Sequence, residues 1–383
     1  MNLLEDFYIT IWDTNFNVLG IIDTIETLEI TKYLSKAGTF ELTVPVTANT
    51  INLLKVGNLI TKATTNVLEK ANYILEPYVI TYRQIKVNNK GVESLEIQGK
   101  SLFVWLKQRI LTQNYNITDS VSNIVAKLLN NECINPSNTA RAIPNLQLGE
   151  GEININTTFS PQTEYSSLSS ALTTLLSQFY IGIEILMSPK EKIYTIQLFQ
   201  GENLALGNSE SNIPIIFSSN LNNIMGETFT HTNVNFNNVA YVYGTLEKNN
   251  TPELVIVGDT TARGLSRFEV GVSGDNPTIN GAELDLTSSN YQKIMTAVGE
   301  QYLATSEITK NFAGKLNMHT DVKYKVNFSV GDKISCINKE WDLNENLIIT
   351  AVTETWSVQG QQISLTFGYP LPTILEKINQ EFF

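Results

Sequence analysis

Histidine is the side chain that most often serves as acid or base near neutral pH, and this 383-residue chain contains two, His231 and His319. They stand in the contexts FTHTN and NMHTD, and neither context matches a metal-binding or catalytic-triad motif. A lone histidine outside such a motif is far more often an exposed or strand-edge residue than a catalytic base. We therefore give neither histidine a catalytic role.

Other side chains capable of chemistry are equally dispersed. Cys133 and Cys336 have no second thiol or histidine near them in the sequence, which excludes a clustered zinc site and a disulfide framework but leaves one long-range bridge open. The 38 acidic residues include no pair marked out for glycoside hydrolysis. Neither a GxxxxGK[ST] phosphate loop nor a GxSxG elbow occurs. We expect no catalytic, cofactor or metal site.

Charge and hydropathy exclude further classes. A net charge of −12 and a pI near 4.8 argue against binding to nucleic acid or to an anionic membrane, because both need Lys and Arg to neutralise phosphate. The opening MNLLEDFYITIWD has acidic residues where a secretory signal needs positive charge. The longest apolar stretches fall far short of the roughly 20 residues that span a bilayer. The sequence predicts a chain made in the cytosol, without membrane insertion.

The elements of the first hundred residues are mostly strands. Residues 7–11 and 18–22 predict a hairpin, and Phe40, Leu42 and Val44 alternate with polar residues up to Pro45, which ends the strand. Further strands are expected at 58–62, 71–85 and 92–98, with a turn at 88–91. Short helices are expected at 50–56 and, as an amphipathic segment, at 101–110.

The next hundred residues mix helix and strand. Asp119 is expected to cap a helix whose apolar residues follow i, i+3, i+4 spacing from Val121 to Leu129. Residues 130–161 predict a long surface loop because they are rich in Asn, Pro and Gly. A second helix is expected over 165–179, followed by a hairpin that turns at 188–192.

From residue 213 the chain returns to strands. A helix is expected over 289–304 and a loop over 271–281. A strand meander is predicted from Tyr324 to Gly368: Val326, Phe328 and Val330 alternate, Gly331 and Asp332 turn the chain, and residues 359–360 form the last hairpin turn. The order of strands, one helix and closing strands occurs early and again late.

The fold class that follows is mainly β with an α+β insert and two barrel-like domains. The domain boundaries we expect are 1–111 for the first β-barrel-like domain, 112–212 for the α+β insert, and 213–383 for the second β-barrel-like domain with one helix.

Several segments together resemble the tail hub (baseplate hub) proteins of bacteriophages and of phage-tail-like bacteriocin particles. In the first half these are KAGTFELTVP, LLKVGNLI and QGKSLFVWLKQRIL, and in the second half NVAYVYG, RGLSRFEV and SVGDKISC, in the order of the family. The residues that carry this pattern are Gly99, Ser101, Leu102, Arg109, Gly244, Arg267, Gly331 and Asp332. For Gly331 and Asp332 we favour a β-turn, and for Arg109 an interdomain or helix-terminal partner, over a ligand site.

The resemblance implies a virion structural protein, not an enzyme. Its subunits would form a homotrimer whose six barrels make a pseudo-sixfold ring, joining the tail tube or distal tail protein to a central spike, tail tip or fibre. The ring would surround the channel for the tape-measure protein and DNA, and an acidic lumen would repel DNA rather than bind it. The protein would be assembled in the bacterial cytoplasm into a virion tail or phage-tail-like particle. The alternatives are a tail-associated cell-wall hydrolase and a carbohydrate- or receptor-binding protein.

Overall fold

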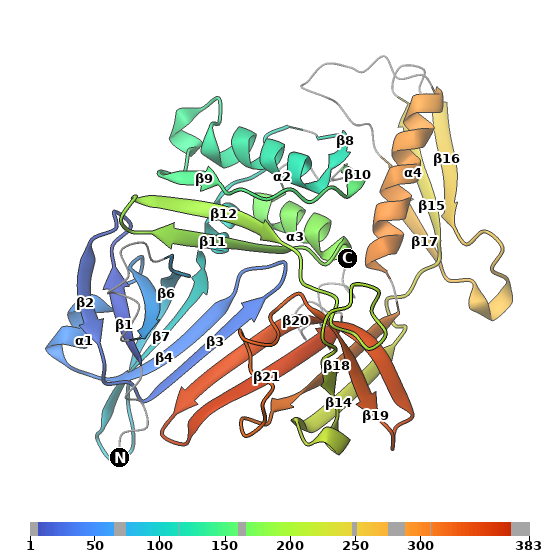
Figure 1. Cartoon of the computed structure of the whole chain (residues 1–383). Helices are drawn as coiled ribbons and strands as arrows, with labels where there is room; N and C mark the ends of the chain where they lie inside the picture. Colours follow the sequence, from blue (N-terminus) through green and yellow to red (C-terminus); the bar gives the residue numbers. More distant parts are fainter. Residues whose placement is uncertain are drawn as a thin grey trace.

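The computed structural model describes residues 7–64, 74–113, 115–159, 166–246, 251–274, 288–306 and 308–368. Its main feature is a thirteen-stranded sheet that runs through both halves of the chain (Figure 1). Eleven of its strands follow one path, in the order β14-β18-β21-β20-β3-β4-β7-β6-β5-β1-β2, and β19 and β13 branch from β20. The mainly β prediction is confirmed.

The first half supplies seven strands of this sheet and one short helix. Phe40, Leu42 and Val44 on β4 are buried in alternation, as predicted, and they enter a core that lies inside the first half. The predicted turn at 88–91 is also present, closed by hydrogen bonds between Asn88 and Val92. The elements are β1 (Phe7–Trp12), β2 (Val18–Ile22), β3 (Thr27–Tyr33), β4 (Thr39–Pro45), α1 (Ala48–Leu53), β5 (Leu59–Thr64), β6 (Tyr78–Val87) and β7 (Glu93–Ser101).

The second half completes the sheet around a core of its own. Its strands are β13 (Ile216–Phe217), β14 (Ile224–Thr232), β18 (Thr309–Leu316), β19 (Lys333–Asn338), β20 (Leu343–Ser357) and β21 (Gly360–Gly368). The strand expected over Val326, Phe328 and Val330 is wrong. That stretch is a loop whose ends are joined by a single bridge from Tyr324 to Phe328, and the alternation arises because Phe328 and Val330 enter the core while Val326 stays exposed.

The two halves meet where β20 pairs with β3 in antiparallel register, from Ala351 opposite Tyr33 to Ser357 opposite Thr27. Because β3 pairs with β4 and β20 and not with β2, the described strands of the first half do not close into a barrel. Each half is barrel-like only in that its strands surround a separate core.

The insert packs against the first half and shares a core with it. Leu168, Leu172, Leu175 and Leu176 are buried on one side of α3, as predicted, whereas Tyr165 lies outside the described residues. Ser120 caps α2 in place of Asp119, which accepts hydrogen bonds from the Ser120 amide and the Asn123 side chain. The elements are η1 (Leu102–Gln108), β8 (Ile117–Ser120), α2 (Val121–Leu129), η2 (Asn130–Ile134), η3 (Thr139–Arg141), β9 (Leu146–Leu148), β10 (Asn156–Phe159), α3 (Leu168–Gln178), β11 (Gly182–Ser188) and β12 (Ile193–Phe199).

The predicted surface loop over 130–161 is therefore wrong as far as residue 159. A turn of π-helix, a 3₁₀ turn and two short strands occupy it, and β10 pairs with β8 while β9 pairs with β12. The segment expected as a helix over 101–110 is a 3₁₀ helix.

Between β14 and β18 the chain forms a small unit of three strands and a helix, which projects at the upper right of Figure 1. It consists of β15 (Val239–Leu246), β16 (Thr251–Gly258), η6 (Gly264–Ser266), β17 (Glu269–Ser273) and α4 (Ser288–Thr305). The predicted helix over 289–304 is confirmed. The predicted loop over 271–281 begins inside β17, and residues 275–281 lie outside the described part of the chain. No helix in the described ranges is long and apolar enough to cross a membrane.

Candidate functional site

The first half, the insert and the second half meet at a group of partly buried charges beside the β3–β20 pairing. Lys32 on β3 donates to Glu184 on β11 at 2.5 Å and lies 3.3 Å from Glu76. Burial opposes the charge of this lysine, but the two carboxylates outweigh it and raise the Lys32 pKa. The ion pairs join the first half to the insert.

A second group joins the halves directly. Glu354 on β20 is 9% exposed, accepts a hydrogen bond from Lys325 at 3.0 Å and lies 3.9 Å from the Lys62 amine. That amine also stands 3.5 Å from the centroid of the Trp356 ring. Burial lowers the pKa of Lys62 to about 8, although the nearby Glu354 carboxylate acts in the opposite direction.

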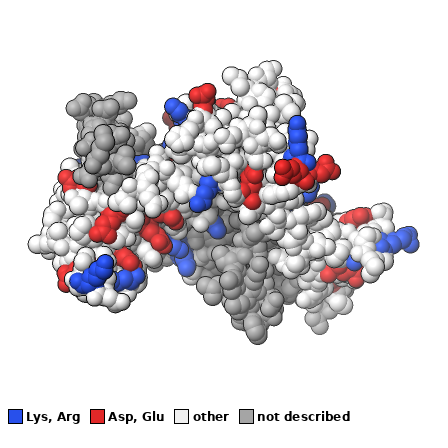
Figure 2. Space-filling model, turned by 90° about the horizontal axis from the view of Figure 1, so that it is seen from below, with Lys and Arg blue, Asp and Glu red and all other residues white. Residues whose placement is uncertain are grey.

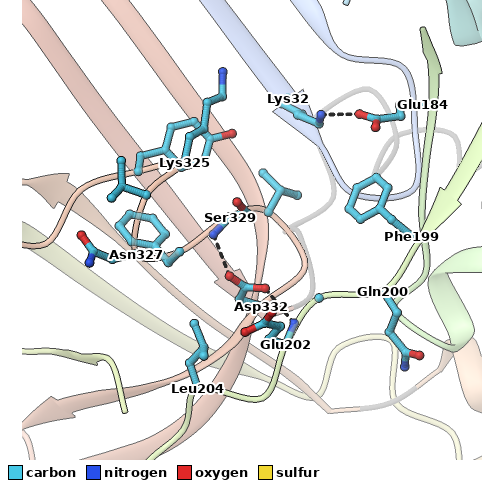
Figure 3. A pocket seen from close by; sticks show the side chains of 15 residues that line it. Lys32, Glu184, Phe199, Gln200, Glu202, Leu204, Lys325, Asn327, Ser329 and Asp332 are labelled. Carbon is cyan, nitrogen blue, oxygen red and sulfur yellow. Dashed lines mark hydrogen bonds and ion pairs between the residues drawn. The ribbon is translucent and has the colours of Figure 1, made fainter. Parts of the chain in front are cut away.

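A pocket of about 430 Å³ opens beside these charges (Figure 3). The Lys32–Glu184 ion pair and the Phe199 ring form one side, and Figure 3 shows Lys325 and Asn327 across from them. It is lined by Lys32, Glu184, Phe199, Gln200, Gly201, Glu202, Leu204, Tyr324, Lys325, Val326, Asn327, Phe328, Ser329, Val330 and Asp332. Residues from all three expected domains therefore line one cavity.

Gly331 and Asp332, two of the residues from the family pattern, lie at this junction. Gly331 has a φ of 100°, a backbone angle that favours glycine. Gly201 packs directly against it, since a Cβ atom on Gly201 would stand 2.0 Å from the carbonyl carbon of Gly331. Asp332 accepts from the amides of Ser329 at 2.7 Å and Glu202 at 2.8 Å. Burial raises the Asp332 pKa against these hydrogen bonds. The turn at Gly331 and Asp332 thus binds the backbone at Glu202, where the chain leaves the insert, to the second half.

Gly99, Ser101, Leu102 and Arg109 lie in the first half and where it enters the insert. A Cβ atom on Gly99 would stand 2.1 Å from the Val79 carbonyl oxygen and 2.2 Å from the Phe40 ring. The Ser101 hydroxyl accepts from the Gly38 amide at 2.9 Å, and Leu102 is fully buried. Arg109 ends η1, and its Nε donates to the Arg141 carbonyl at 2.5 Å.

A buried ion pair near Arg109 was missed by sequence reasoning. Glu132 is 0% exposed and accepts from Arg141 at 2.8 Å, from the Tyr115 hydroxyl at 2.6 Å and from the Thr112 amide at 3.0 Å. The signal was present, because Glu132 follows Leu128 by four positions and Leu129 by three. An acidic residue that extends the buried face of α2 needs partners inside the protein.

Gly244 and Arg267 lie in the projecting unit of β15–β17 and α4. A Cβ atom on Gly244 would stand 2.1 Å from the Tyr291 hydroxyl, which donates to the Gly274 carbonyl at 2.7 Å. Arg267 donates to Glu269 at 2.5 Å and to the Tyr241 hydroxyl at 3.0 Å. The residues of the family pattern thus occupy three separate places, and each has a packing or hydrogen-bonding role there.

The side chains considered for catalysis do not converge. The described residues include no group of three or more His, Cys, Asp or Glu side chains placed to hold a metal ion. Cys133 and Cys336 lie in different hydrophobic cores, and burial raises the pKa of the Cys133 thiol to about 12. His231 lies on β14, opposite Lys310.

Exposed apolar side chains gather on strand edges and on one sheet face. Tyr243, Leu254 and Ile256 face out of the projecting sheet, and the edge strand β2 exposes further aliphatic residues. The free end of the β6–β7 hairpin exposes Ile85 and Val87. On the face seen in Figure 2, acidic and basic residues stand in small mixed groups separated by uncharged surface.

Several solved protein structures share the fold of this chain. Solved structures with a similar fold include the tail protein of Neisseria meningitidis MC58 (14% identity, 95% of this chain and 96% of that one, TM-score 0.56) and the prophage MuSo2 43 kDa tail protein of Shewanella oneidensis (11%, 95% and 98%, 0.53). Prophage tail protein gp18 of Listeria monocytogenes EGD-e is also similar (9%, 98% and 98%, 0.52). No curated protein matches the sequence.

The family model described as Siphovirus ReqiPepy6 Gp37-like protein matches residues 8–369. Together with the shared fold, this match confirms the predicted resemblance to phage tail hub proteins. The chain belongs to the Siphovirus ReqiPepy6 Gp37-like protein family.

Proposed function

We propose that this chain is a non-enzymatic hub subunit of a phage tail, in which three copies form a ring of pseudo-sixfold symmetry. The ring joins the tail tube or distal tail protein to the spike, fibre or tail tip, and the tape-measure protein passes through it. A phage tail or a phage-tail-like particle, assembled in the bacterial cytoplasm, is the setting of this function.

The observation that carries the proposal is a repeated arrangement of four strands. From one end of the sheet path the order is β14-β18-β21-β20, and then β3-β4-β7-β6. If the four strands of each set are numbered along the chain, both sets have the same order in the sheet, 1-2-4-3. Every neighbouring pair in both sets is antiparallel. One chain therefore contains two units of the same strand order and direction, and three such chains supply six units.

A shared irregularity supports the equivalence of the two units. The β6–β7 ladder has a bulge at Thr81, and the β20–β21 ladder has one at Thr350. The Thr81 hydroxyl lies 3.5 Å from the Gln98 carbonyl oxygen, and the Thr350 hydroxyl lies 3.4 Å from the corresponding Thr366 carbonyl oxygen while donating to the Gly368 carbonyl at 2.7 Å. Two unrelated sheets would rarely place a bulged threonine at corresponding positions.

The test is assembly. Light scattering or native mass spectrometry of the purified protein, alone and mixed with the tube and spike proteins of its particle, should detect a trimer that binds both partners. A monomer that joins neither partner would contradict the proposal. A zymogram on peptidoglycan tests the alternative of a cell-wall hydrolase, and a clearing band would overturn the non-enzymatic assignment.

A further inference from the structure

The pocket at the junction contains carboxylates that its own lysines do not neutralise. Two lysines line it, Lys32 and Lys325, and each already has acidic partners. Lys32 is bound by Glu184 and Glu76, and Lys325 donates to Glu354 at 3.0 Å. The charges of both lysines are therefore balanced within the chain.

Glu202 and Asp332 are the acidic lining residues that remain. Asp332 accepts hydrogen bonds from the backbone amides of Ser329 and Glu202, and neither carboxylate has a cation partner within the described ranges. Burial of Asp332 raises its pKa, and the nearby Glu202 carboxylate acts in the same direction, against the two amides. Figure 3 shows the Lys325 amine pointing away from Asp332, and Lys333, the next residue in the chain, does not line the pocket. The pocket therefore presents two negative charges to whatever enters it.

Aromatic side chains form part of the pocket wall. Phe199 and Tyr324 line it, and Phe199 lies beside the Lys32–Glu184 ion pair in Figure 3. A cation that contacts a carboxylate and lies on an aromatic ring gains from both contacts. A guanidinium is flat, stacks on a ring and binds a carboxylate through two N–H groups, whereas an ammonium is a compact and strongly hydrated charge. The combination of carboxylates and rings thus favours a guanidinium.

An organic cation also fits better than a metal ion. The described residues include no group of three or more His, Cys, Asp or Glu side chains placed to hold a metal. Calcium and magnesium need about six oxygen ligands, which the two free carboxylates do not supply. The pocket volume of about 430 Å³ lies in the range of roughly 300 to 1,000 Å³ that is usual for pockets of organic ligands.

We propose that this pocket binds an arginine side chain of another tail protein, with the guanidinium on Glu202 and Asp332 and its flat face against Phe199. The choice of a tail protein as the partner rests on the proposed function. The choice of a guanidinium rests on the pocket alone.

The mouth of the pocket suits a side chain that is attached to a polypeptide. Val326 lines the pocket and is 76% exposed, so a backbone on either side of the arginine would cover an apolar group there. The loop that carries Val326 is held in place by backbone hydrogen bonds from Lys325 to Phe328 at 2.8 Å and from Asn327 to Lys323 at 2.9 Å. A free polyamine would leave Val326 exposed and has no flat group to place on Phe199.

The experiment is saturation-transfer NMR of the purified full chain with the probe N-acetylarginine methylamide. The matched probe is the citrulline analogue, which has nearly the same shape and no charge. A partly exposed ion pair and one ring contact are each worth little, so we expect a dissociation constant of roughly 1 mM for the arginine probe. The citrulline probe should bind about tenfold more weakly.

Three variants locate the site. Glu202→Gln removes the charge of an exposed side chain and should weaken binding of the arginine probe about fivefold. Phe199→Leu keeps an apolar side chain but removes the ring, and it should weaken binding about threefold. Glu340→Gln is the matched control, because Glu340 is exposed and lies outside the pocket lining, and it should leave binding unchanged.

Equal binding of the two probes, or equal losses in Glu202→Gln and Glu340→Gln, would overturn the inference. So would the absence of binding at roughly ten times the expected dissociation constant. Spermidine that binds more tightly than the arginine probe and is released by Glu202→Gln would assign the pocket to a free polyamine instead. Probe binding does not require assembly. A chain that joins its tail partners but binds no arginine therefore overturns this inference alone, whereas one that binds arginine and never assembles supports the site and contradicts the proposed function.

Discussion

Replacement of Arg141 by Met should be among the most damaging single changes outside the β-sheet. The guanidinium stands 2.8 Å from the fully buried Glu132 carboxylate and also donates to the Ile110 carbonyl at 2.7 Å. Methionine keeps much of the volume but removes the positive charge, and it leaves a carboxylate inside the protein without a counter-ion. Breaking a buried pair from one side typically costs about 3 to 5 kcal/mol.

The remaining contacts place the expected loss at the lower end of that range. Glu132 still accepts from the Thr112 amide, the Thr112 hydroxyl and the Tyr115 hydroxyl. Ile110 is 42% exposed, so water can replace the hydrogen bond that its carbonyl loses. We therefore expect a loss of about 3 kcal/mol, which corresponds to roughly a hundredfold faster local opening.

Hydrogen exchange measured by mass spectrometry on peptides covering α2 and residues 130–134 reports that opening directly. It is preferable to one global unfolding curve, since a chain of this size need not unfold in a single step. Arg263→Met removes an exposed arginine far along the chain and should leave exchange in α2 unchanged. If Arg141→Met accelerates exchange there by less than about tenfold, the ion pair does not hold the insert as argued.

Two other predictions follow from close packing and from titration. Gly99→Ala should lower the free energy of unfolding in denaturant by about 1 to 3 kcal/mol, because the new methyl group would stand 2.1 Å from the Val79 carbonyl oxygen and 2.2 Å from the Phe40 ring. Gly271→Ala is the control and should cost little, because the nearest atom to its new methyl group is 3.5 Å away. Equal losses in the two variants would contradict the steric explanation. Burial lowers the Lys62 pKa to about 8 from an unfolded value of 10.5, so between these pH values the unfolded chain binds more protons than the folded chain. Lys62 therefore makes the free energy of unfolding rise with pH in this range, by at most about 1.4 kcal/mol per pH unit. Lys62→Met should reduce the slope of the urea midpoint against pH, and an unchanged slope would show that Lys62 is not the group responsible.

The spacing of apolar residues predicted the strands and helices that bury one regular face in a core. The alternation of Phe40, Leu42 and Val44 and the 3.6-residue spacing of α2 both reflect faces that enter a core, so they could be recognised without the rest of the chain. The cap of α2 was misplaced by one residue because Asp119 and Ser120 both suit a helix N-terminus. Choosing between them requires the geometry of the turn.

Other errors came from segments whose structure depends on distant partners. Strands β9 and β10 are three and four residues long, lie in an Asn-rich stretch, and exist because β12 and β8 provide their hydrogen bonds. Conversely, Phe328 and Val330 alternate like strand residues, but they lie in a loop and each packs into the core of the second half. The pocket at the junction could not be foreseen, since it is made by Lys32, Glu184 and Asp332 from three regions far apart in sequence.

The repeated bulge is consistent with the proposed ring, in which two units with different side chains would serve as equal parts. A bulge adds one residue to a strand, bends it and increases its twist, and these effects depend on backbone geometry more than on neighbouring side chains. Thr81 and Thr350 are the unpaired residues at corresponding places, so both units bend at the same point. At the positions that follow, Ile85 and Glu354 can differ because one faces solvent in the single chain and the other faces the charged junction. Equal curvature with unequal side chains would let the proposed ring close evenly while the contact within each subunit stays distinct from the contact between subunits.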